Sequence, residues 1–251
     1  MLNISNLSAG YPGRQVLSNL NLTIPGGSFT AIVGPNGCGK STLLKAIVGL
    51  LPYEGDISLE QVALRNLSAN ARAKKIAYLP QSRSVPQLSA EKLVLHGRFP
   101  YLSYPRRYRE EDRLAAADAL RALEIEDLTQ RWLPALSGGE RQKVYLAMAL
   151  AQQTPVILMD EPTAPLDICH KFQVLALARR LARQGKTVIL VLHDLDLALT
   201  YADHIVVMEQ GHIAAHGTAE EIVNKGILEK VFHIHITKAE TDSGVRYCFY
   251  P

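Results

Sequence analysis

The order of apolar and polar residues predicts strands at the start of the chain and then a helix. Apolar and polar residues alternate over Leu20–Ile24, which is typical of a half-buried strand, and Pro25–Gly27 then supplies a turn. Phe29–Val33 is an unbroken apolar run, as expected of a central strand covered on both faces. From Ser41 onward the apolar positions 43, 44, 47 and 48 have helical spacing. A buried strand is therefore expected to lead through a short glycine-rich segment into an amphipathic helix.

Strands and helices are expected to alternate further along the chain. Short strands are predicted at 55–59 and 75–79, and a helix at about 109–123, with an apolar face that includes Leu114 and Leu120. The later predicted elements are helix 139–153, strand 156–160, helix 172–183, strand 187–192, helix 195–202 and a hairpin of 205–208 with 212–215. This alternation argues for an α/β domain with a mostly parallel core sheet, into which 85–150 is inserted as a helical segment.

The segment between the first central strand and its helix has the phosphate-loop pattern G-x-x-x-x-G-K-S/T, written here Gly34-Pro35-Asn36-Gly37-Cys38-Gly39-Lys40-Ser41. Glycines let backbone N–H groups converge on phosphate oxygens at a helix N-terminus, whose partial positive charge favours an anion. In such a loop the Lys40 ammonium reaches the β- and γ-phosphates and the Ser41 hydroxyl ligates Mg²⁺. The alternative, a glycine-rich turn followed by chance by Lys-Ser-Thr, is disfavoured by the flanking strand and helix. Cys38 is expected to expose its thiol beside the phosphate without a catalytic role.

A second candidate site follows the apolar run Val156–Met159, which ends in Asp160 and Glu161. A buried strand delivers both carboxylates to its C-terminal edge, where ligands bind in open α/β sheets. Asp160 can hold the Mg²⁺ bound by Ser41, and Glu161 can polarise a water for in-line attack on the γ-phosphate. Two solvated acids at a strand end are the alternative, and the phosphate loop upstream favours the nucleotide site.

Between these sites lies Leu136-Ser137-Gly138-Gly139-Glu140, and here the sequence resembles the nucleotide-binding subunits of ABC transporters, whose signature motif is LSGGQ or LSGGE. The resemblance covers essentially the whole chain. It implies an α/β fold, an ABC-type P-loop NTPase with a mostly parallel RecA-like core sheet, an N-terminal antiparallel β subdomain and a helical subdomain. It also implies one ATP-binding domain over 1–251, in which about 1–84 and 154–251 form the catalytic core with the β subdomain and about 85–153 the helical signature subdomain.

Other marks of the family follow in order along the chain. Tyr11 has the place of the aromatic residue that stacks on adenine, and Gln81 matches the glutamine-loop residue. Asp167, in Ala164-Pro165-Leu166-Asp167, looks like the residue that communicates across the dimer, and His193 looks like the switch histidine. Taken alone, each has a structural alternative: surface packing for Tyr11, an exposed loop amide for Gln81, and a structural histidine at a strand end for His193.

The resemblance assigns three groups of site residues in an ATPase. The residues implied to bind ATP are Tyr11, Gly34, Pro35, Asn36, Gly37, Cys38, Gly39, Lys40, Ser41, Thr42, Ser137, Gly138, Gly139, Glu140 and Asp167. The residues implied in catalysis are Glu161, His193 and Gln81, and those implied in holding Mg²⁺ are Ser41, Gln81 and Asp160.

The signature segment predicts a partner. Ser137–Gly139 make a second anion-receptive helix start, although an ordinary helix N-cap is the alternative. One phosphate loop needs no second cradle in its own site, so the economical arrangement, which the family supports, is a head-to-tail homodimer in which each signature closes on the other copy's ATP. The resemblance also implies transmembrane permease subunits, received in a groove formed largely by Ser82–Arg98, and indirectly an extracytoplasmic substrate-binding protein.

Three stretches narrow the resemblance. His96–Tyr101 looks like the G-R-F/Y-P-Y/W element of ATPases that serve importers of iron–siderophore complexes, haem and cobalamin. Asp167–His170 and His193–Ala198 resemble their L-D-I-x-H and H-D-L-N-x-A stretches, with Asp196 as a mild departure. The alternatives are an ATPase for import of zinc, manganese or another substrate, a soluble non-transport ABC ATPase and a small-metabolite kinase.

Composition and charge agree with this picture. The 251 residues are 47% apolar and 20% charged, which fits a globular protein and excludes a disordered or collagen-like chain. A net charge of +3 is too small to argue for a nucleic-acid partner. Cys38, Cys169 and Cys248 have neither disulfide-framework nor zinc spacing. No apolar run reaches the roughly 18–20 residues of a membrane span. Together with the permease subunits that the resemblance implies, this leads us to expect a peripheral protein at the cytoplasmic face of the inner membrane.

Overall fold

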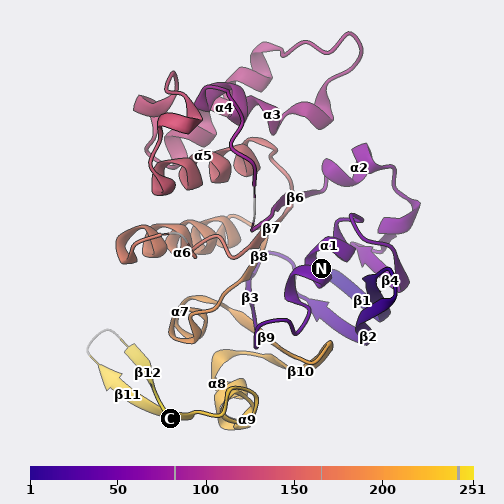
Figure 1. Ribbon diagram of the computed structural model, residues 1–251, viewed down its shortest axis with the longest axis vertical. Helices are drawn as coiled ribbons and strands as arrows, with labels where there is room; N and C mark the ends of the chain where they lie inside the picture. The colour runs from indigo at the N-terminus through magenta and orange to yellow at the C-terminus, as the bar shows by residue number, and fades with distance from the viewer. Residues whose placement is uncertain (82, 165, 242–243) are drawn as a thin grey trace. The chain divides into compact units, whose positions relative to one another are not determined.

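The chain forms two compact units, Met1–Leu67 with Leu175–Pro251 and, between them, Ser68–Val174. The computed structural model describes residues 1–81, 83–164, 166–241 and 244–251 (Figure 1). Ser82, at the start of the predicted permease groove, and Pro165, in the predicted dimer loop, lie outside the described residues. The predicted functional boundaries near 84 and 154 divide the chain by role rather than by compactness, and they stay a prediction.

The first unit begins with an antiparallel sheet, as the family resemblance implied. Strand β1 (Leu2–Tyr11) lies between β2 (Arg14–Ile24) and β4 (Tyr53–Leu59), and β5 (Val62–Ala63) pairs with β4. The apolar residues that alternate along β2 are buried and their polar neighbours are exposed. This is the pattern of a sheet with one face on the core.

The same unit holds a parallel core. Strand β3 (Phe29–Val33) pairs in parallel with β8 (Thr187–Val191) on one side and with β9 (His204–Glu209) on the other. All residues of β3 and β8 are buried, as the unbroken apolar runs predicted. Strand β10 (His212–Gly217) returns antiparallel to β9, which confirms the predicted hairpin. Helix α1 (Lys40–Ile47) follows β3, and α7 (Leu195–Tyr201) follows β8.

Most elements formed by residues after 217 were not predicted from the sequence pattern. Helices α8 (Ala219–Asn224) and α9 (Ile227–Phe232) precede a two-stranded antiparallel sheet of β11 (His235–Thr241) and β12 (Gly244–Tyr250) (Figure 1). Thr218 begins α8 with a capping box. These elements are short, and two turns of helix carry too few residues for a clear apolar period.

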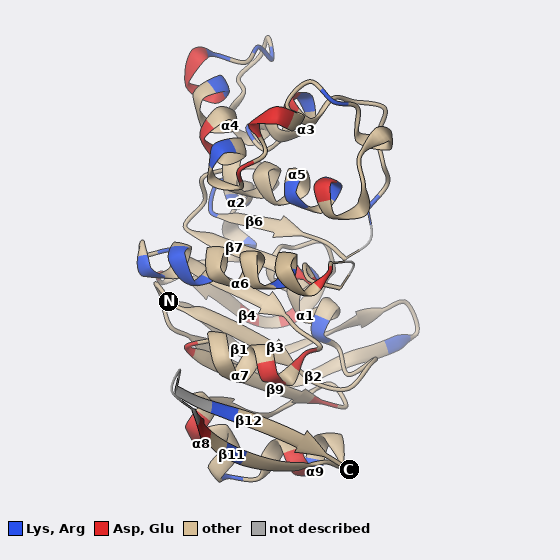
Figure 2. Ribbon diagram, turned by 90° about the vertical axis from the view of Figure 1, so that its left-hand side faces the viewer, with Lys and Arg blue, Asp and Glu red and all other residues tan. Residues whose placement is uncertain are grey.

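The second unit contains a parallel pair of strands, β6 (Ile76–Leu79) and β7 (Val156–Asp160). Helix α2 (Ala69–Ala73) precedes β6. Helix α6 (Ile168–Arg183) begins in this unit, four residues before the predicted start at 172, and its residues from Leu175 onward are assigned to the first unit. Its basic residues include Arg180 and Arg183 in the last turn, where cations complement the helix carbonyls (Figure 2). The short 3-10 helices of the chain are η1 (Leu64–Asn66), η2 (Phe99–Tyr101), η3 (Glu126–Leu128) and η4 (Leu133–Ala135).

Helices α3 (Ala90–His96), α4 (Glu110–Ala122) and α5 (Gly138–Ala151) pack against one another in the second unit. The predicted helix at 109–123 is present, but its predicted apolar face is only partly right, because Leu120 is buried whereas Leu114 is 56% exposed. The buried residues of α4 are Asp112, Ala115, Ala116, Ala119 and Leu120. Alanine carries little apolar area, so the larger leucines dominated the sequence pattern. The buried face of α4 is made mainly of alanines, whose small side chains let the helices pack closely.

The side chain of Arg98 joins these three helices. Its Nε donates to Oδ1 of Asp112 at 2.9 Å, and its Nη1 donates to the carbonyl of Ala151 at 3.1 Å. Oδ2 of Asp112 accepts from the backbone N–H of Arg109 at 3.0 Å. Burial alone would raise the pKa of Asp112, but the Arg109 N–H and the Arg98 guanidinium outweigh it and hold that pKa below its usual range. The stretch His96–Tyr101, which resembles an importer element, therefore has a packing role within this unit.

Gly97 in this stretch is required by a close backbone approach. A Cβ at Gly97 would lie 2.2 Å from the carbonyl oxygen of Met148 in α5. Next to it, the hydroxyl of Tyr101 donates to the carbonyl of Gln152 at 2.9 Å. The glycine, the arginine and the tyrosine of this stretch all serve the contact between α3 and α5.

Across the ranges that the structure describes, no helix is both long enough and apolar enough to cross a membrane.

Replacing Asp112 by alanine should lower the free energy of unfolding at neutral pH by about 3–5 kcal/mol, because Arg98 is then buried without its counter-ion. Since the pKa of Asp112 is lowered by folding, this stabilisation is present above the ordinary aspartate pKa of about 4 and is lost as the pH falls through the lower folded value. Urea unfolding of wild type and variant at neutral and acid pH measures both effects.

Asp118→Ala is the matched control in the same helix, because the Arg121–Asp118 pair is solvent-exposed and worth at most about 0.5 kcal/mol. Equal losses for the two variants would contradict a special role for the buried pair.

Candidate functional site

The phosphate loop has the predicted context, since it connects the buried strand β3 to helix α1. Lys40 is only 5% exposed, and its Nζ donates to the carbonyls of Gly34 at 2.7 Å and Pro35 at 3.0 Å. These carbonyls belong to the loop itself, so the ammonium draws the loop into a closed turn. A lysine ammonium carries three rotatable donors on a flexible stem, so it can exchange these carbonyls for phosphate oxygens.

Cys38 is buried, so the expected exposed thiol is wrong. Burial raises the pKa of the Cys38 thiol, and the nearby Lys40 ammonium only partly opposes this effect. The carbonyl of Cys38 accepts from the N–H of Gly211 at 3.0 Å, which ties the loop to the β9–β10 turn. A neutral, buried thiol is a poor nucleophile, in agreement with the expectation that Cys38 has no catalytic role.

Gly34 has no room for a side chain. A Cβ there would lie 2.2 Å from the carbonyl oxygen of Met208 in β9, whereas a Cβ at Gly37 would meet no described atom within 4 Å. Gly34 is therefore required because β9 leaves no space for a side chain, whereas Gly37 faces open space.

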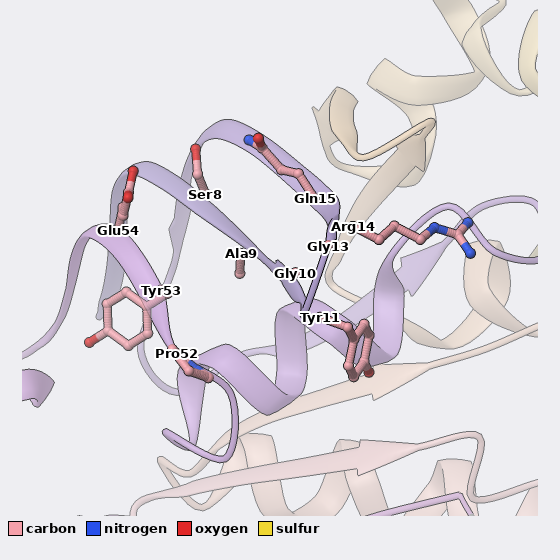
Figure 3. Close-up of a pocket in the computed structure, with 10 residues that line it drawn as sticks. All are labelled: Ser8, Ala9, Gly10, Tyr11, Gly13, Arg14, Gln15, Pro52, Tyr53 and Glu54. Atoms are coloured by element: carbon pink, nitrogen blue, oxygen red, sulfur yellow. The ribbon is translucent and has the colours of Figure 1, made fainter.

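Tyr11 lies at the end of β1, on the rim of a pocket of about 420 Å³ formed by β1, β2 and the start of β4. Figure 3 shows Tyr11 and Tyr53 on opposite sides of this pocket. The hydroxyl of Tyr11 accepts a hydrogen bond from Nζ of Lys45 in α1 at 3.2 Å. The ring expected to stack on adenine is thereby held to the helix that follows the phosphate loop.

His193 is exposed and follows β8 by two residues, just before α7 begins. The backbone N–H of Leu192 donates to the carbonyl of Ile32 in β3 at 3.1 Å. This bond places the segment carrying His193 beside the strand that leads to the phosphate loop, within the first unit.

The acidic residues belong to the second unit. Asp160 is buried at the end of β7, and its Oδ2 accepts from the hydroxyl of Tyr78 at 3.5 Å. Glu161 follows with a positive φ of 51°, a backbone region that non-glycine residues seldom adopt. Nε2 of Gln81 donates to the Glu161 carboxylate. Two residues predicted to act in catalysis are therefore in contact.

The signature segment begins α5 with a capping box. The Ser137 hydroxyl accepts from the N–H of Glu140 at 3.2 Å, and the Glu140 carboxylate accepts from the N–H of Ser137 at 2.7 Å. The pKa of Glu140 lies below its usual range, mainly because its carboxylate accepts from the Ser137 N–H. The charge of Arg131 lowers this pKa further. The helix N-terminus is thus capped by its own residues and exposed to solvent.

Asp167 caps the start of α6. Its Oδ1 accepts from the backbone N–H of His170 at 2.9 Å and contacts Nδ1 of the same residue at 2.8 Å. The N–H of His170 is the largest cause of an Asp167 pKa below its usual range. An ionised, exposed carboxylate is therefore present where the resemblance implies contact with a second copy.

The sequence analysis missed three contacting residues, Lys45, Arg83 and Gln142. Gln142 is 3% exposed in α5; its Oε1 accepts from Arg83 at 2.7 Å and its Nε2 donates to the carbonyl of Pro162 at 2.6 Å. A polar residue on the buried face of a predicted helix was the available signal, because a buried amide needs partners.

These groups fall in separate units. Tyr11, the loop 34–42 and His193 lie in the first unit, and the remaining predicted site residues lie in the second.

Comparison with known proteins decides the family. Residues 17–164 match the family described as ABC transporter, which is more than half of the chain. The chain belongs to the ABC transporter family. As a member, it binds and hydrolyses ATP. The fold class implied by the sequence is confirmed, because solved ABC ATPases share it.

Individual relatives of this ABC ATPase cover most of its length. The iron(3+)-hydroxamate import ATP-binding protein FhuC of Bacillus subtilis is 39% identical over 236 residues, 93% of this chain and 88% of the relative. The hemin import ATP-binding protein HmuV of Nocardia farcinica is 42% identical over 223 residues, 88% of this chain and 77% of the relative. The dimeric cassette MJ0796 bound to ADP and Pi is 30% identical with a TM-score of 0.77, covering 87% of this chain and 99% of that one.

Gly34→Ala should destabilise this ABC ATPase strongly, because its methyl group would overlap the Met208 carbonyl. We expect a loss of about 2–4 kcal/mol, within the range of severe overpacking. Gly37→Ala is the matched control, with only the backbone penalty of about 1 kcal/mol for a positive φ. Thermal unfolding of the nucleotide-free proteins compares them, and a control that unfolds earlier than Gly34→Ala would contradict the steric argument.

Proposed function

We propose that this chain works as a head-to-tail homodimer that hydrolyses Mg²⁺-ATP and drives a permease importing an iron chelate, such as a ferric siderophore or haem. The observation that carries the proposal is its 39–42% identity, over most of its length, to import ATP-binding proteins named for iron(3+)-hydroxamate and hemin. The chemistry comes from the phosphate loop and from the end of β7 with the loop after it, which carry Asp160 and Glu161 and are here called the acidic loop.

The residues assigned to Mg²⁺ suit a hard cation. Ser41, Gln81 and Asp160 offer hydroxyl, amide and carboxylate oxygens, the ligands that Mg²⁺ prefers, and Asp160 is buried where a cation would neutralise it. The described residues hold no cluster of three His, Cys, Asp or Glu side chains, so the nucleotide phosphates would complete the coordination. When bound, Mg²⁺ neutralises charge on the β- and γ-phosphates.

Within the nucleotide site, Lys40 binds the β- and γ-phosphates after releasing the loop carbonyls that it now holds. Glu161 accepts a proton from the attacking water, for which its carboxylate must first be released by Gln81. His193 steadies the γ-phosphate. The Gln81–Glu161 contact thus represents a resting arrangement, in which the Glu161 carboxylate is hydrogen-bonded to Gln81 and not to the attacking water.

The glycines of the signature support a second copy as partner. A Cβ at Gly138 would meet no described atom within 4 Å, and one at Gly139 would meet only Leu166, at 3.8 Å. Glycine weakens a helix by about 1 kcal/mol relative to alanine, and nothing inside the described chain requires it at either position. Close approach of another body explains both, and the exposed Ser137 hydroxyl can still donate its hydrogen to a phosphate.

Glu161→Gln should lower kcat by about 100- to 10,000-fold, because the amide cannot accept the proton of the attacking water. ATP affinity should remain, since the phosphate loop is unchanged, and an ATP-bound dimer should accumulate. Phosphate release and size-exclusion chromatography with Mg²⁺-ATP measure the two effects.

Lys40→Ala is the complementary control: it should lose ATP binding and form no dimer. Wild-type turnover in Glu161→Gln would remove Glu161 as the base, and full ATP affinity in Lys40→Ala would remove the phosphate-loop assignment.

The proposed substrate and the proposed position at the membrane are supported by the same relatives. An import ATPase of this kind attaches to the cytoplasmic face of the inner membrane through its permease, and the permease takes substrate from an extracytoplasmic binding protein. Zinc or manganese import is the alternative within transport, and cobalamin import is a neighbouring possibility within the chelate group.

Cells that lack this chain should lose uptake of iron supplied as a siderophore or as haem, and wild type but not Glu161→Gln should restore it. Uptake of zinc, manganese and cobalamin by the same cells is the specificity control. Loss of zinc or manganese uptake alone would overturn the chelate assignment. Purification of the wild-type chain without any membrane-embedded partner, in detergent that preserves such complexes, would favour a soluble ATPase.

A further inference from the structure

Glu161 is held in a backbone conformation that it would not adopt unaided. Its φ of 51° lies in the left-handed region, which non-glycine residues occupy only where the surroundings enforce it. One turn bond, from the N–H of Ala164 to the carbonyl of Glu161 at 3.3 Å, is long and therefore weak. The conformation therefore depends on contacts from outside the loop.

Gln142 supplies such a contact to the next residue. Its Nε2 donates to the carbonyl oxygen of Pro162 at 2.6 Å, so the Gln142 side chain holds the Pro162–Thr163 peptide group, the second peptide group after Glu161. Gln142 is buried, and a buried amide that lost this partner would leave an unpaired donor. The bond is thus both short and costly to break.

Arg83 determines which way the Gln142 amide faces. A guanidinium can only donate and a carbonyl can only accept, so the amide oxygen must face Arg83, at 2.7 Å, and the amide nitrogen must face Pro162. If the amide were reversed, its NH₂ group would face the Arg83 guanidinium, donor against donor. Its oxygen would face the Pro162 carbonyl oxygen, acceptor against acceptor. One orientation alone satisfies both neighbours.

Arg83 is itself fixed against α5. Its guanidinium lies 4.4 Å from the ring centroid of Tyr145, whose hydroxyl donates to the carbonyl of Ser84 at 2.6 Å. The segment that follows Gln81 is thereby fastened to the signature helix one turn after the capping box. Gln81 in turn donates to Glu161 itself.

We propose that Gln142, oriented by Arg83, is a positioning residue for hydrolysis: it holds the Pro162 peptide and so keeps the Glu161 carboxylate in its productive backbone conformation. The inference rests on the proposed role of Glu161 as the base. Neither Gln142 nor Arg83 touches the reacting atoms in this scheme, and both act through the loop that carries Glu161.

The test measures kcat and KM for Mg²⁺-ATP in Gln142→Met, which keeps the side-chain length and removes both hydrogen bonds. We expect kcat to fall about 10- to 100-fold while KM changes less than about twofold, because the phosphate loop is untouched and only the base is misplaced. Arg83→Met should lower kcat in the same direction, and Arg83→Lys should recover part of it, since lysine can still donate to the amide oxygen.

Gln152→Met is the matched control at the end of the same helix. Gln152 also donates to backbone carbonyls, those of Ala73 and Ile76, but these lie away from Glu161 in the chain and are not bonded to its loop. It should lose stability like Gln142→Met and keep kcat within about twofold of wild type.

The decisive comparison repeats Gln142→Met in the Glu161→Gln background, where it should have no further effect on residual turnover. An equal fall in both backgrounds would show a general structural role and overturn the proposal, as would wild-type kcat in Gln142→Met. Full turnover in Glu161→Gln alone would instead overturn the proposed base, which separates the two failures. If Gln142→Met does not fold, wild-type kcat in Arg83→Met overturns the proposal.

Discussion

The burial of whole strands on both faces is the constraint on which the functional residues depend. All five residues of β3, of β7 and of β8 are buried. A charge within such a strand would be removed from water without a partner, at a large free-energy cost, so charged groups are confined to the strand ends. The phosphate loop follows β3, Asp160 and Glu161 stand at the end of β7, and His193 follows β8. The apolar core of each unit thereby decides where its chemistry can be placed.

Backbone carbonyls are the recurring partners of the polar side chains at these ends. Lys40 holds the phosphate loop through Gly34 and Pro35, and Gln142 holds the acidic loop through Pro162. A bond to a carbonyl fixes the path of the main chain and leaves the neighbouring side chain able to react. The same device, used by Arg98 on the carbonyl of Ala151, fixes helices rather than a loop. Functional loops and packing contacts are thus built from one kind of interaction.

The sequence predicted the parallel core well, because an unbroken apolar run and a glycine-rich loop are strong local signals. It predicted α4 but assigned its inward face only partly correctly, since alanines at the contact carry little hydrophobic signal and Asp112 is a charge that only its partner makes tolerable in the core. The short helices α8 and α9 gave no signal. The stretch His96–Tyr101 was interpreted as a mark of a transporter subgroup, and the structure adds a physical reason for its residues in the contacts of Gly97, Arg98 and Tyr101 with α5 and its C-terminal residues.

By itself, the sequence determined the kind of chemistry: a phosphate loop and a strand ending in two acids are patterns of contiguous residues, and the signature segment adds a resemblance to one family. Only the tertiary structure decided which residues support them. Arg83, Gln142 and Pro162 are far apart in the chain, and an amide between a donor and an acceptor acquires its role when folding brings both within hydrogen-bonding distance. Likewise, Gly34 is required by the carbonyl of Met208 in β9, a strand that is far from Gly34 in sequence and beside it in the fold. Local patterns encode local geometry, whereas the partner of a buried polar group is fixed by packing.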